Sequence, residues 1–373
     1  MSRVLLLILF PLSVLFSNEY YQGDSLVWEG VHAFYNYEFD HSVKILTKAR
    51  EIYPDHPGVH LVWAASRWVR SKANDPVERT YEILEFDLNE IIPVYNVLVT
   101  KYPHDQTFKL YRGSAIGLGA RVTLGKKEWL KTLYQGYKGF SIINDVAEKT
   151  PELQDAKLPI GIVEYYAGLS NILLKWVVEL YGLDPSRESG LRQMSIAADN
   201  GDWTRIEAKS ILSFLYLWVE DEPVLAAEYA WDLQNQFPNN FYFKILFLES
   251  IIRTEQYELS ERIIEDIEII SSNLTNRQQE WYLPYLDYER GLFFFHLKQY
   301  DKALEYLEKA ISQYTGELDV ILSNAFLLKG MILDLQYRRL DAKSSYYACL
   351  KLDNFSSSME KAKAYLKQPY KNP

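Results

Sequence analysis

Residues 284–317 read PYLDYERGLFFFHLKQYDKALEYLEKAISQYTGE, and they contain the clearest helical pattern in the chain. Within this stretch Ala303, Leu307 and Ala310 recur at three- and four-residue intervals, with charged residues between them. Such spacing places apolar side chains along one side of an α-helix. Gly291 precedes Ala303 by 12 residues. That interval predicts two antiparallel helices that pack closely where their small residues meet.

The same interval occurs twice more in the chain. Gly30, Ser42 and Pro54 follow one another at 12-residue steps, and Gly330 precedes Ala342 by the same distance. Pro54 is expected to end its helix, because proline lacks an amide hydrogen and restricts the residue before it. Each helix pair leaves an apolar face uncovered, and stacking successive pairs buries that face. We therefore expect an all-α solenoid.

This pattern resembles the tetratricopeptide repeat (TPR), in which small residues, an aromatic residue and a proline recur over 34 residues. The segments most similar to the repeat are 23–56, 203–240, 284–317 and 323–356. The resemblance implies a right-handed superhelical solenoid of about eight antiparallel helix pairs, followed by a C-terminal capping helix. This solenoid would occupy residues 18–373.

Apolar periodicity places the helices within this solenoid. The expected pairs are 24–37 with 40–53, 58–73 with 78–101, 106–125 with 128–149, 160–181 with 187–199, 203–219 with 222–236, 240–254 with 257–271, 276–297 with 300–314 and 318–335 with 340–352. The capping helix is expected near 356–367. Its lysines, at positions 361, 363 and 367, are expected to face solvent as the end of a solenoid requires.

A second resemblance covers the middle of the chain. The stretches 161–168, 197–201 and 237–240 read GIVEYYAG, AADNG and FPNN. Together they are similar to a long-helix bacterial branch of TPR proteins, and distantly to the tetratricopeptide repeat protein 39 family. This resemblance implies a helical scaffold with no defined reaction.

The composition excludes several classes of protein. Hydrophobic residues make up 48% of the chain and charged residues 24%, which is typical of a folded protein. The net charge of −10 argues against nucleic acid as the main partner, because phosphates bind to basic surfaces. Cys349 is the one cysteine, so no internal disulfide can form, and we expect it to be buried.

The N-terminus has the features of a secretory signal peptide over residues 1–17. Arg3 supplies the positive charge, residues 4–16 are mostly apolar, and the small Ser17 precedes polar residues. We expect cleavage near Ser17, so that the mature protein begins near Asn18 and is exported. In a bacterium it would reach the periplasm or the outer-membrane periphery. The alternative is an uncleaved signal anchor. No later stretch is apolar enough to predict a transmembrane helix.

Two motifs suggest chemistry, but neither meets the requirements. His56 and His60 have the spacing of metal ligands on a helix, but Pro57 between them indicates an exposed turn. Gly119 and Gly125 enclose five residues where a phosphate-binding loop has four, so close helix packing explains these glycines better. The sequence therefore predicts no catalytic residue, metal ligand or cofactor, and we expect a protein that is not an enzyme.

Aromatic residues are unusually frequent, at 15% of the chain. Packing between long helices accounts for many of them, but some would line the inner curve of the solenoid, where tyrosine and tryptophan bind partners. The glycine positions identify Phe34, Tyr288 and Phe295 as the candidate partner-binding residues. The competing interpretation is that these three only pack against neighbouring repeats.

The sequence thus favours an exported scaffold that binds a protein or peptide through its concave face, without catalysis. The alternative is a carrier or retention module for an apolar small molecule, held in an aromatic-lined groove. Both need an inner surface rich in apolar side chains, so the sequence does not separate them.

Overall fold

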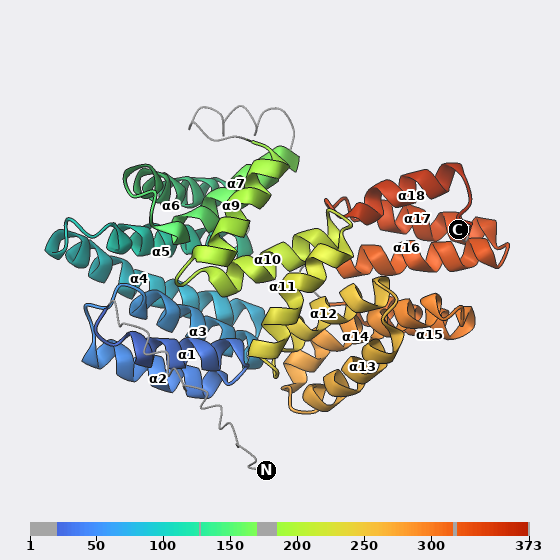
Figure 1. Ribbon diagram of the computed structural model, residues 1–373, viewed down its shortest axis with the longest axis horizontal. Coiled ribbons are helices and arrows are strands. Elements are labelled where there is room, and N and C mark those ends of the chain that lie inside the picture. The colour runs from blue at the N-terminus through green and yellow to red at the C-terminus, as the bar shows by residue number, and fades with distance from the viewer. Residues whose placement is uncertain (1–20, 127, 170–184, 316–318, 372–373) are drawn as a thin grey trace, which may run out of the picture.

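The computed structural model describes residues 21–126, 128–169, 185–315 and 319–371, and within these ranges all regular structure is helical (Figure 1). The prediction of an all-α, TPR-like solenoid is confirmed. The signal peptide predicted for residues 1–17 lies outside the described residues. In the described ranges, no helix is long and apolar enough to cross a membrane.

The helices follow one another with short connections. In chain order they are α1 (Asp24–Tyr35), α2 (Phe39–Ile52), α3 (Val59–Asn74), α4 (Val77–Lys101), α5 (Gln106–Gly125), α6 (Trp129–Lys149), the short 3-10 helix η1 (Gln154–Ala156), α7 (Lys157–Leu169), α9 (Arg187–Asn200), α10 (Arg205–Trp218), α11 (Pro223–Gln236), α12 (Phe241–Arg253), α13 (Tyr257–Ser271), α14 (Asn276–His296), α15 (Tyr300–Gln313), α16 (Val320–Leu335), α17 (Arg339–Lys351) and α18 (Ser357–Lys367). The helix expected at 160–181 is described only as far as Leu169.

Small residues lie where paired helices cross. A Cβ atom added to Gly30 of α1 would lie 2.5 Å from Leu46 Cγ of α2, and Ser42 Oγ donates a hydrogen bond of 2.8 Å to the Gly30 carbonyl. A Cβ atom on Gly291 of α14 would lie 2.8 Å from Leu307 of α15. Glycine at the crossing therefore makes room for the leucine that fills the seam.

A left-handed residue joins the two helices of several pairs. Positive φ angles occur at Tyr37, Asp221, Glu255, Lys298 and Tyr337, each in the turn within a pair. Asp221 and Glu255 stand 34 residues apart, which is the TPR period. The amides of Lys298 and Gln299 each donate a 2.9 Å hydrogen bond to the last turn of α14, so the turn satisfies the end of the helix.

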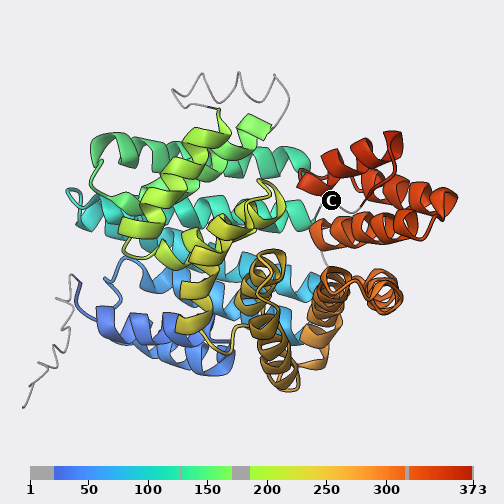
Figure 2. The same ribbon diagram turned by 45° about the vertical axis from the view of Figure 1, so that its right-hand side comes forward.

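The superhelix curves until its first helices meet α10–α14 (Figures 1 and 2). Trp28 of α1 stacks on Trp203, just before α10, with ring centroids 4.4 Å apart. Asn240 Nδ2 donates a 2.7 Å hydrogen bond to the Tyr35 carbonyl at the end of α1. Thr275, which caps α14, also bonds to the carbonyl of Ala73 in α3. These contacts close α1–α14 into a ring.

The C-terminal helices α16–α18 form a second curved part beside this ring (Figure 2). Lys361 of α18 reaches back to Asp221, where its Nζ lies 2.6 Å from the carboxylate. Lys361 is therefore half-buried rather than fully solvent-facing as expected, because the curvature brings α18 against the turn between α10 and α11. Lys363 and Lys367 are exposed as expected.

Candidate functional site

Two cavities lie between the helices of the solenoid. The interior cavity, of about 720 Å³, lies inside the α1–α14 ring and is lined by Phe34, Trp68, Glu207, Tyr242 and Trp281, among others. The C-terminal cavity, of about 690 Å³, lies between the α10–α12 region and α14–α18. Both volumes fall in the range of small-ligand sites.

Aromatic side chains from six helices, α1, α2, α3, α5, α12 and α14, form much of the interior cavity wall. Phe34 comes from α1, Trp68 from α3, Tyr242 from α12, and Trp281 and Tyr282 from α14. Each of these residues lies on the apolar side of its helix, and closure of the ring orients that side toward the interior. The wall therefore combines flat apolar faces with tyrosine hydroxyl groups.

Two hydrogen-bonded pairs of polar side chains lie in the wall of this cavity. The Tyr37 hydroxyl lies 3.1 Å from the Tyr282 hydroxyl, and the Tyr35 hydroxyl donates a 3.3 Å hydrogen bond to Glu207. Water reaches the Glu207 carboxylate, but the surrounding helices limit its hydration and raise its pKa. The pKa of Tyr35 is raised by burial and by the Glu207 charge, so Tyr35 stays protonated and donates.

The other two charged groups in the wall already have partners. Asp155 accepts hydrogen bonds from the amides of Trp203 and Thr204, at 3.0 Å each, and so holds the chain entering α10. The Lys72 ammonium lies 5.3 Å from the ring centre of Trp68 and 5.5 Å from that of Trp281. These distances are within the range of cation–π contacts.

Part of the chain's own C-terminal segment forms one wall of the C-terminal cavity. Residues 368–371 line it together with Phe295 of α14. Gln368 has extended backbone angles, and the Tyr370 amide donates a 2.8 Å hydrogen bond to Asp334 of α16. The Tyr370 ring packs 6.3 Å from the Phe295 ring, centre to centre. An extended segment with an aromatic side chain thus fits against this wall.

A charged network forms the floor of the C-terminal cavity. Arg253 of α12 donates a 2.6 Å hydrogen bond to the Leu217 carbonyl, and it also pairs with Asp221, the partner of Lys361. Glu249, one turn before Arg253, accepts a 2.6 Å hydrogen bond from the Trp218 indole. The network therefore ties α10, α12 and α18 together.

Glu289 of α14 lies against Glu249 in the core. Burial raises the pKa of Glu249, and burial together with the Glu249 charge holds the pKa of Glu289 well above its ordinary value. No described donor reaches either carboxyl oxygen of Glu289, so its retained proton is the hydrogen available to bond to Glu249. Glu249 and Glu289 are 1% and 0% exposed, so their carboxyl groups contact other core residues rather than solvent.

The three candidate partner-binding residues are divided between the two cavities. Phe34 is half-buried and lines the interior cavity. Phe295 is half-buried in the wall of the C-terminal cavity, and Tyr288 contributes to the same wall but is only 3% exposed. The Tyr288 hydroxyl donates a 3.4 Å hydrogen bond to Glu249, so this ring also serves the core. Partner binding by these residues stays a prediction.

His56 and His60 do not lie in an exposed turn as expected. They are 2% and 3% exposed, because ring closure and the packing of α3 cover the loop. His56 accepts hydrogen bonds from the amides of Gly58 and Val59 and lies 2.7 Å from Asp24, while His60 Nε2 lies 2.8 Å from the Pro54 carbonyl. Among the described residues, no group of three or more potential ligands is placed to hold a metal ion.

The glycines of α5 and α6 lie at the helix crossing. A Cβ atom on Gly139 would lie 2.6 Å from the Gly117 amide nitrogen and 2.7 Å from the Gly113 carbonyl oxygen. Close packing of two backbones accounts for them. Cys349 is fully buried, and burial raises the pKa of its thiol to about 11, as suits a packing role.

Sequence reasoning missed Glu207, Tyr242 and the Arg253 network. Glu207 stands among charged and apolar residues in the first turn of α10, where a carboxylate is usually solvated surface. No local sequence pattern identifies Glu207, because only ring closure places its carboxylate among aromatic rings. Tyr282 belongs to a run of tyrosines, which is a visible but ambiguous signal.

Comparison with known proteins identifies the fold and no family. No protein-family model matches the sequence, and no curated protein matches it. The resemblance to the tetratricopeptide repeat protein 39 family therefore stays a prediction.

Solved structures share the solenoid architecture. A chain in the crystal structure of the APC/C hetero-tetramer Cut9–Hcn1 superposes with a TM-score of 0.53 at 14% identity, over 93% of this chain and 55% of that one. This chain thus spans about half the length of that relative. A tetratricopeptide repeat protein from Parabacteroides merdae ATCC 43184 (TM-score 0.32, 13% identity, 92% and 97% covered) and yeast Tom70 (0.38, 11%, 93% and 96%) also match. The chain has a TPR-like fold.

Proposed function

We propose that this protein is an exported TPR-like scaffold that binds a protein or peptide partner on its concave face and carries out no catalysis. The observation that supports this function is the position of residues 368–371, which form part of the wall of the C-terminal cavity. There an extended segment of the chain places an aromatic ring beside Phe295. A partner segment of similar chemistry would bind in the same way, since aromatic anchors in pockets provide much of the energy of peptide recognition.

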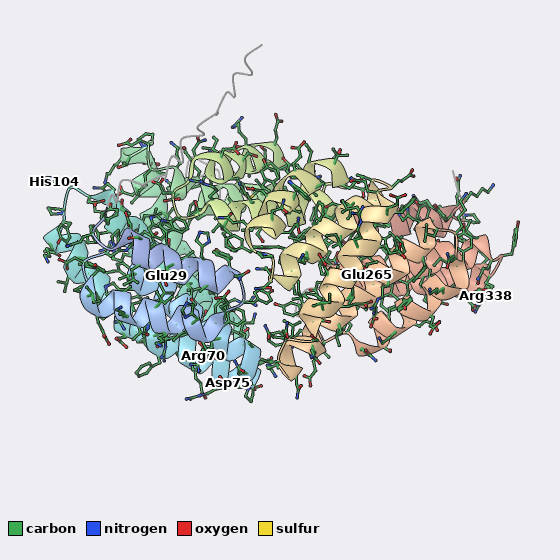
Figure 3. The ribbon with its side chains drawn as sticks, turned by 60° about the horizontal axis from the view of Figure 1, so that its bottom comes forward. Glu29, Arg70, Asp75, His104, Glu265 and Arg338 are labelled. Atoms are coloured by element: carbon green, nitrogen blue, oxygen red, sulfur yellow. The ribbon has the colours of Figure 1, made fainter. Side chains whose placement is uncertain are left out.

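Photo-crosslinking in the native host tests this proposal. The amino acid p-benzoylphenylalanine replaces Phe295, and crosslinked products are identified by mass spectrometry after irradiation. The matched control carries the same amino acid at Glu265, which is exposed on α13 and lines neither cavity (Figure 3). A partner that crosslinks from position 295 and not from position 265 supports the proposal, and a partner found only at position 265 contradicts it.

Two further variants define the energetics of this site. Phe295→Ala should weaken capture of that partner by about 1 kcal/mol or more, as loss of an aromatic hot spot does. Tyr370→Ala should strengthen capture, because the chain's own ring no longer competes for the wall. If Tyr370→Ala leaves capture unchanged, the partner does not use this cavity.

We also propose that the mature chain begins near Asn18 and lies outside the cytoplasm, in the periplasm or at the outer-membrane periphery of a bacterium. The order of Arg3, an apolar stretch and Ser17 supports this location. N-terminal sequencing of protein purified from the native host tests it. An intact Met1 on cytoplasmic protein would refute it.

The interior cavity favours a second function, the retention of an apolar small molecule. Its volume of about 720 Å³ and its aromatic wall suit a ligand of drug-like size. Native mass spectrometry of protein purified without detergent tests this function through the mass of any retained ligand. Ala65→Phe, which adds a ring to the cavity wall, should abolish retention.

A further inference from the structure

Glu207 is the carboxylate of the interior cavity that lacks a positive partner. Within the described ranges it forms no salt bridge, and it accepts a 3.3 Å hydrogen bond from the Tyr35 hydroxyl. It stands in the first turn of α10, where the helix N-terminus favours a negative charge. The Glu207 side chain is exposed to the water of the cavity, so a ligand that enters the cavity can reach its charge.

Aromatic rings surround this carboxylate. Tyr35 bonds to it directly, and Tyr242 is close enough for the Glu207 charge to raise the pKa of the tyrosine. Phe243 stacks beside Tyr35 with ring centroids 6.1 Å apart. The faces of such rings carry negative potential and attract cations, most strongly where water is displaced. The site therefore combines one full negative charge with several surfaces that favour a positive one.

The cavity's other charged groups leave Glu207 free to select a ligand. Asp155 is 3% exposed and its carboxylate is occupied by the backbone before α10. Lys72 interacts with the rings of Trp68 and Trp281. Neither group therefore neutralises the carboxylate, and the rest of the wall is predominantly apolar.

We propose that the interior cavity binds a small organic cation, with its ammonium group at Glu207 and its apolar body against the aromatic wall. This inference rests on the small-molecule function proposed above and names the class of its ligand. It is independent of the protein partner proposed for the C-terminal cavity. The positive ammonium group pairs with the negative Glu207 carboxylate, and the rings of Tyr35 and Tyr242 contact the sides of the ammonium group.

Three probes with one carbon skeleton test the proposal: 4-phenylbutylamine, 4-phenyl-1-butanol and 4-phenylbutyrate are the cation, the neutral molecule and the anion. Binding to the full chain is measured by calorimetry and by the fluorescence of the cavity tryptophans. We expect the amine to bind at least about tenfold more tightly than the alcohol, as a hydrogen bond to a charged group implies. The anion should bind most weakly.

Glu207→Gln tests the assigned residue, because glutamine keeps the size of the side chain and can still accept from Tyr35. The variant should bind the amine and the alcohol with nearly equal affinity. Glu265→Gln removes the same charge from an exposed site on α13 and should keep the preference of the parent chain (Figure 3). Thermal unfolding confirms that each variant is folded.

Each alternative outcome is distinct. If the parent binds the amine and the alcohol equally, the small-molecule function stands but the cation inference is wrong. If Glu207→Gln keeps the amine preference, the cation binds elsewhere and the assignment to Glu207 is wrong. If the parent binds none of the probes, both the inference and the small-molecule function it rests on are refuted.

Discussion

Glycine determines packing in this protein only where a second backbone or a seam side chain comes close. Gly139 of α6 faces the backbone of α5, which has no room to move, whereas Gly136 in the same helix has its nearest neighbour, Ala120 Cβ, 3.9 Å from an added Cβ atom. Two glycines three residues apart thus have opposite roles, one at the crossing and one beside it.

Alanine at these two positions should therefore change stability in opposite directions. Gly139→Ala should destabilise the fold by about 1–3 kcal/mol, because overpacking separates the two helices. Gly136→Ala should stabilise it by about 0.5–1 kcal/mol, since alanine is the better helix former. Urea denaturation of both variants and the parent measures the difference. Equal effects at the two positions would mean that α5 and α6 do not cross at Gly139.

The buried Glu249–Glu289 pair makes stability depend on pH. Glu289 keeps its proton to a higher pH in the folded chain than in the unfolded chain, whose glutamates have a pKa of about 4.3. Above that pH the folded state binds more protons, so its stability falls as pH rises through the folded pKa. Arg253, Tyr288 and Trp218 surround the pair, and none of them supplies a hydrogen bond to Glu289.

Glu289→Gln should remove this dependence. Glutamine resembles the protonated carboxyl group and still donates to Glu249. The parent should lose about 1.4 kcal/mol of stability, relative to the variant, for each unit by which the Glu289 pKa is raised. Denaturation at pH 5 and pH 8 measures the two slopes, with Glu265→Gln as the control. Parallel slopes for parent and variant would show that Glu289 does not carry the proton.

The packing and burial of individual residues were only partly predictable from the sequence. The interval from Gly30 to Ser42 marks a crossing because packing of two helices restricts local side-chain size. The burial of His56 and His60 was not predictable, because it depends on which distant elements cover their loop. A proline between two histidines suggests a turn but does not reveal whether that turn is exposed.

At the scale of elements, the turn within a helix pair is the recurring unit. Tyr37, Lys298 and Tyr337 each lie seven residues after a glycine of the first helix and adopt positive φ. Asp221 and Glu255 do the same, seven residues after Phe214 and Leu248. Apolar periodicity predicts these two pairs without the glycine marker, because large residues stand where the others have glycine, while Ala226 and Ser260 remain small and fully buried.

A glycine in one of these turns should stabilise the protein. Lys298 has φ of 61°, a conformation that costs a residue with a side chain roughly 1 kcal/mol and costs glycine much less. Lys298→Gly is expected to raise the free energy of unfolding by up to about 1 kcal/mol. Gln299, the next residue, has φ of −89° and serves as the control, since glycine gains nothing there. Thermal unfolding of both variants measures this. A loss of stability in Lys298→Gly would show that the lysine side chain contributes more than the turn geometry.

At the scale of the whole molecule, closure of the ring creates the interior cavity. The number and type of helices follow from hydrophobic period and proline positions, which are local features. Closure follows from the small rotation of each helix pair relative to the one before it. These rotations add up over many pairs, and the total cannot be predicted from patterns of single residues. This is why the sequence predicted an aromatic concave face but not the separation of Phe34 from Phe295, nor the position of Glu207 inside the ring.

Asn240 is the residue at which closure can be tested, because it performs two separable tasks. Its Oδ1 atom accepts a 3.0 Å hydrogen bond from the Phe243 amide and so caps α12, while its Nδ2 atom donates to the Tyr35 carbonyl at the end of α1. Asn240 is 4% exposed, so water does not readily replace either bond. A serine at this position can still cap the helix but is too short to reach Tyr35.

Asn240→Ser should therefore weaken the ring and spare the helix. Leaving the Tyr35 carbonyl unpaired should cost about 1–3 kcal/mol of stability. Hydrogen exchange should accelerate at the turn of residues 36–38 and remain unchanged at the start of α12, whereas Asn240→Ala should accelerate exchange at both places. The same opening should weaken 4-phenylbutylamine binding in the interior cavity and leave partner capture at Phe295 intact. If Asn240→Ser reduces partner capture as strongly as amine binding, the two cavities are not independent, and the concave face acts as one continuous site.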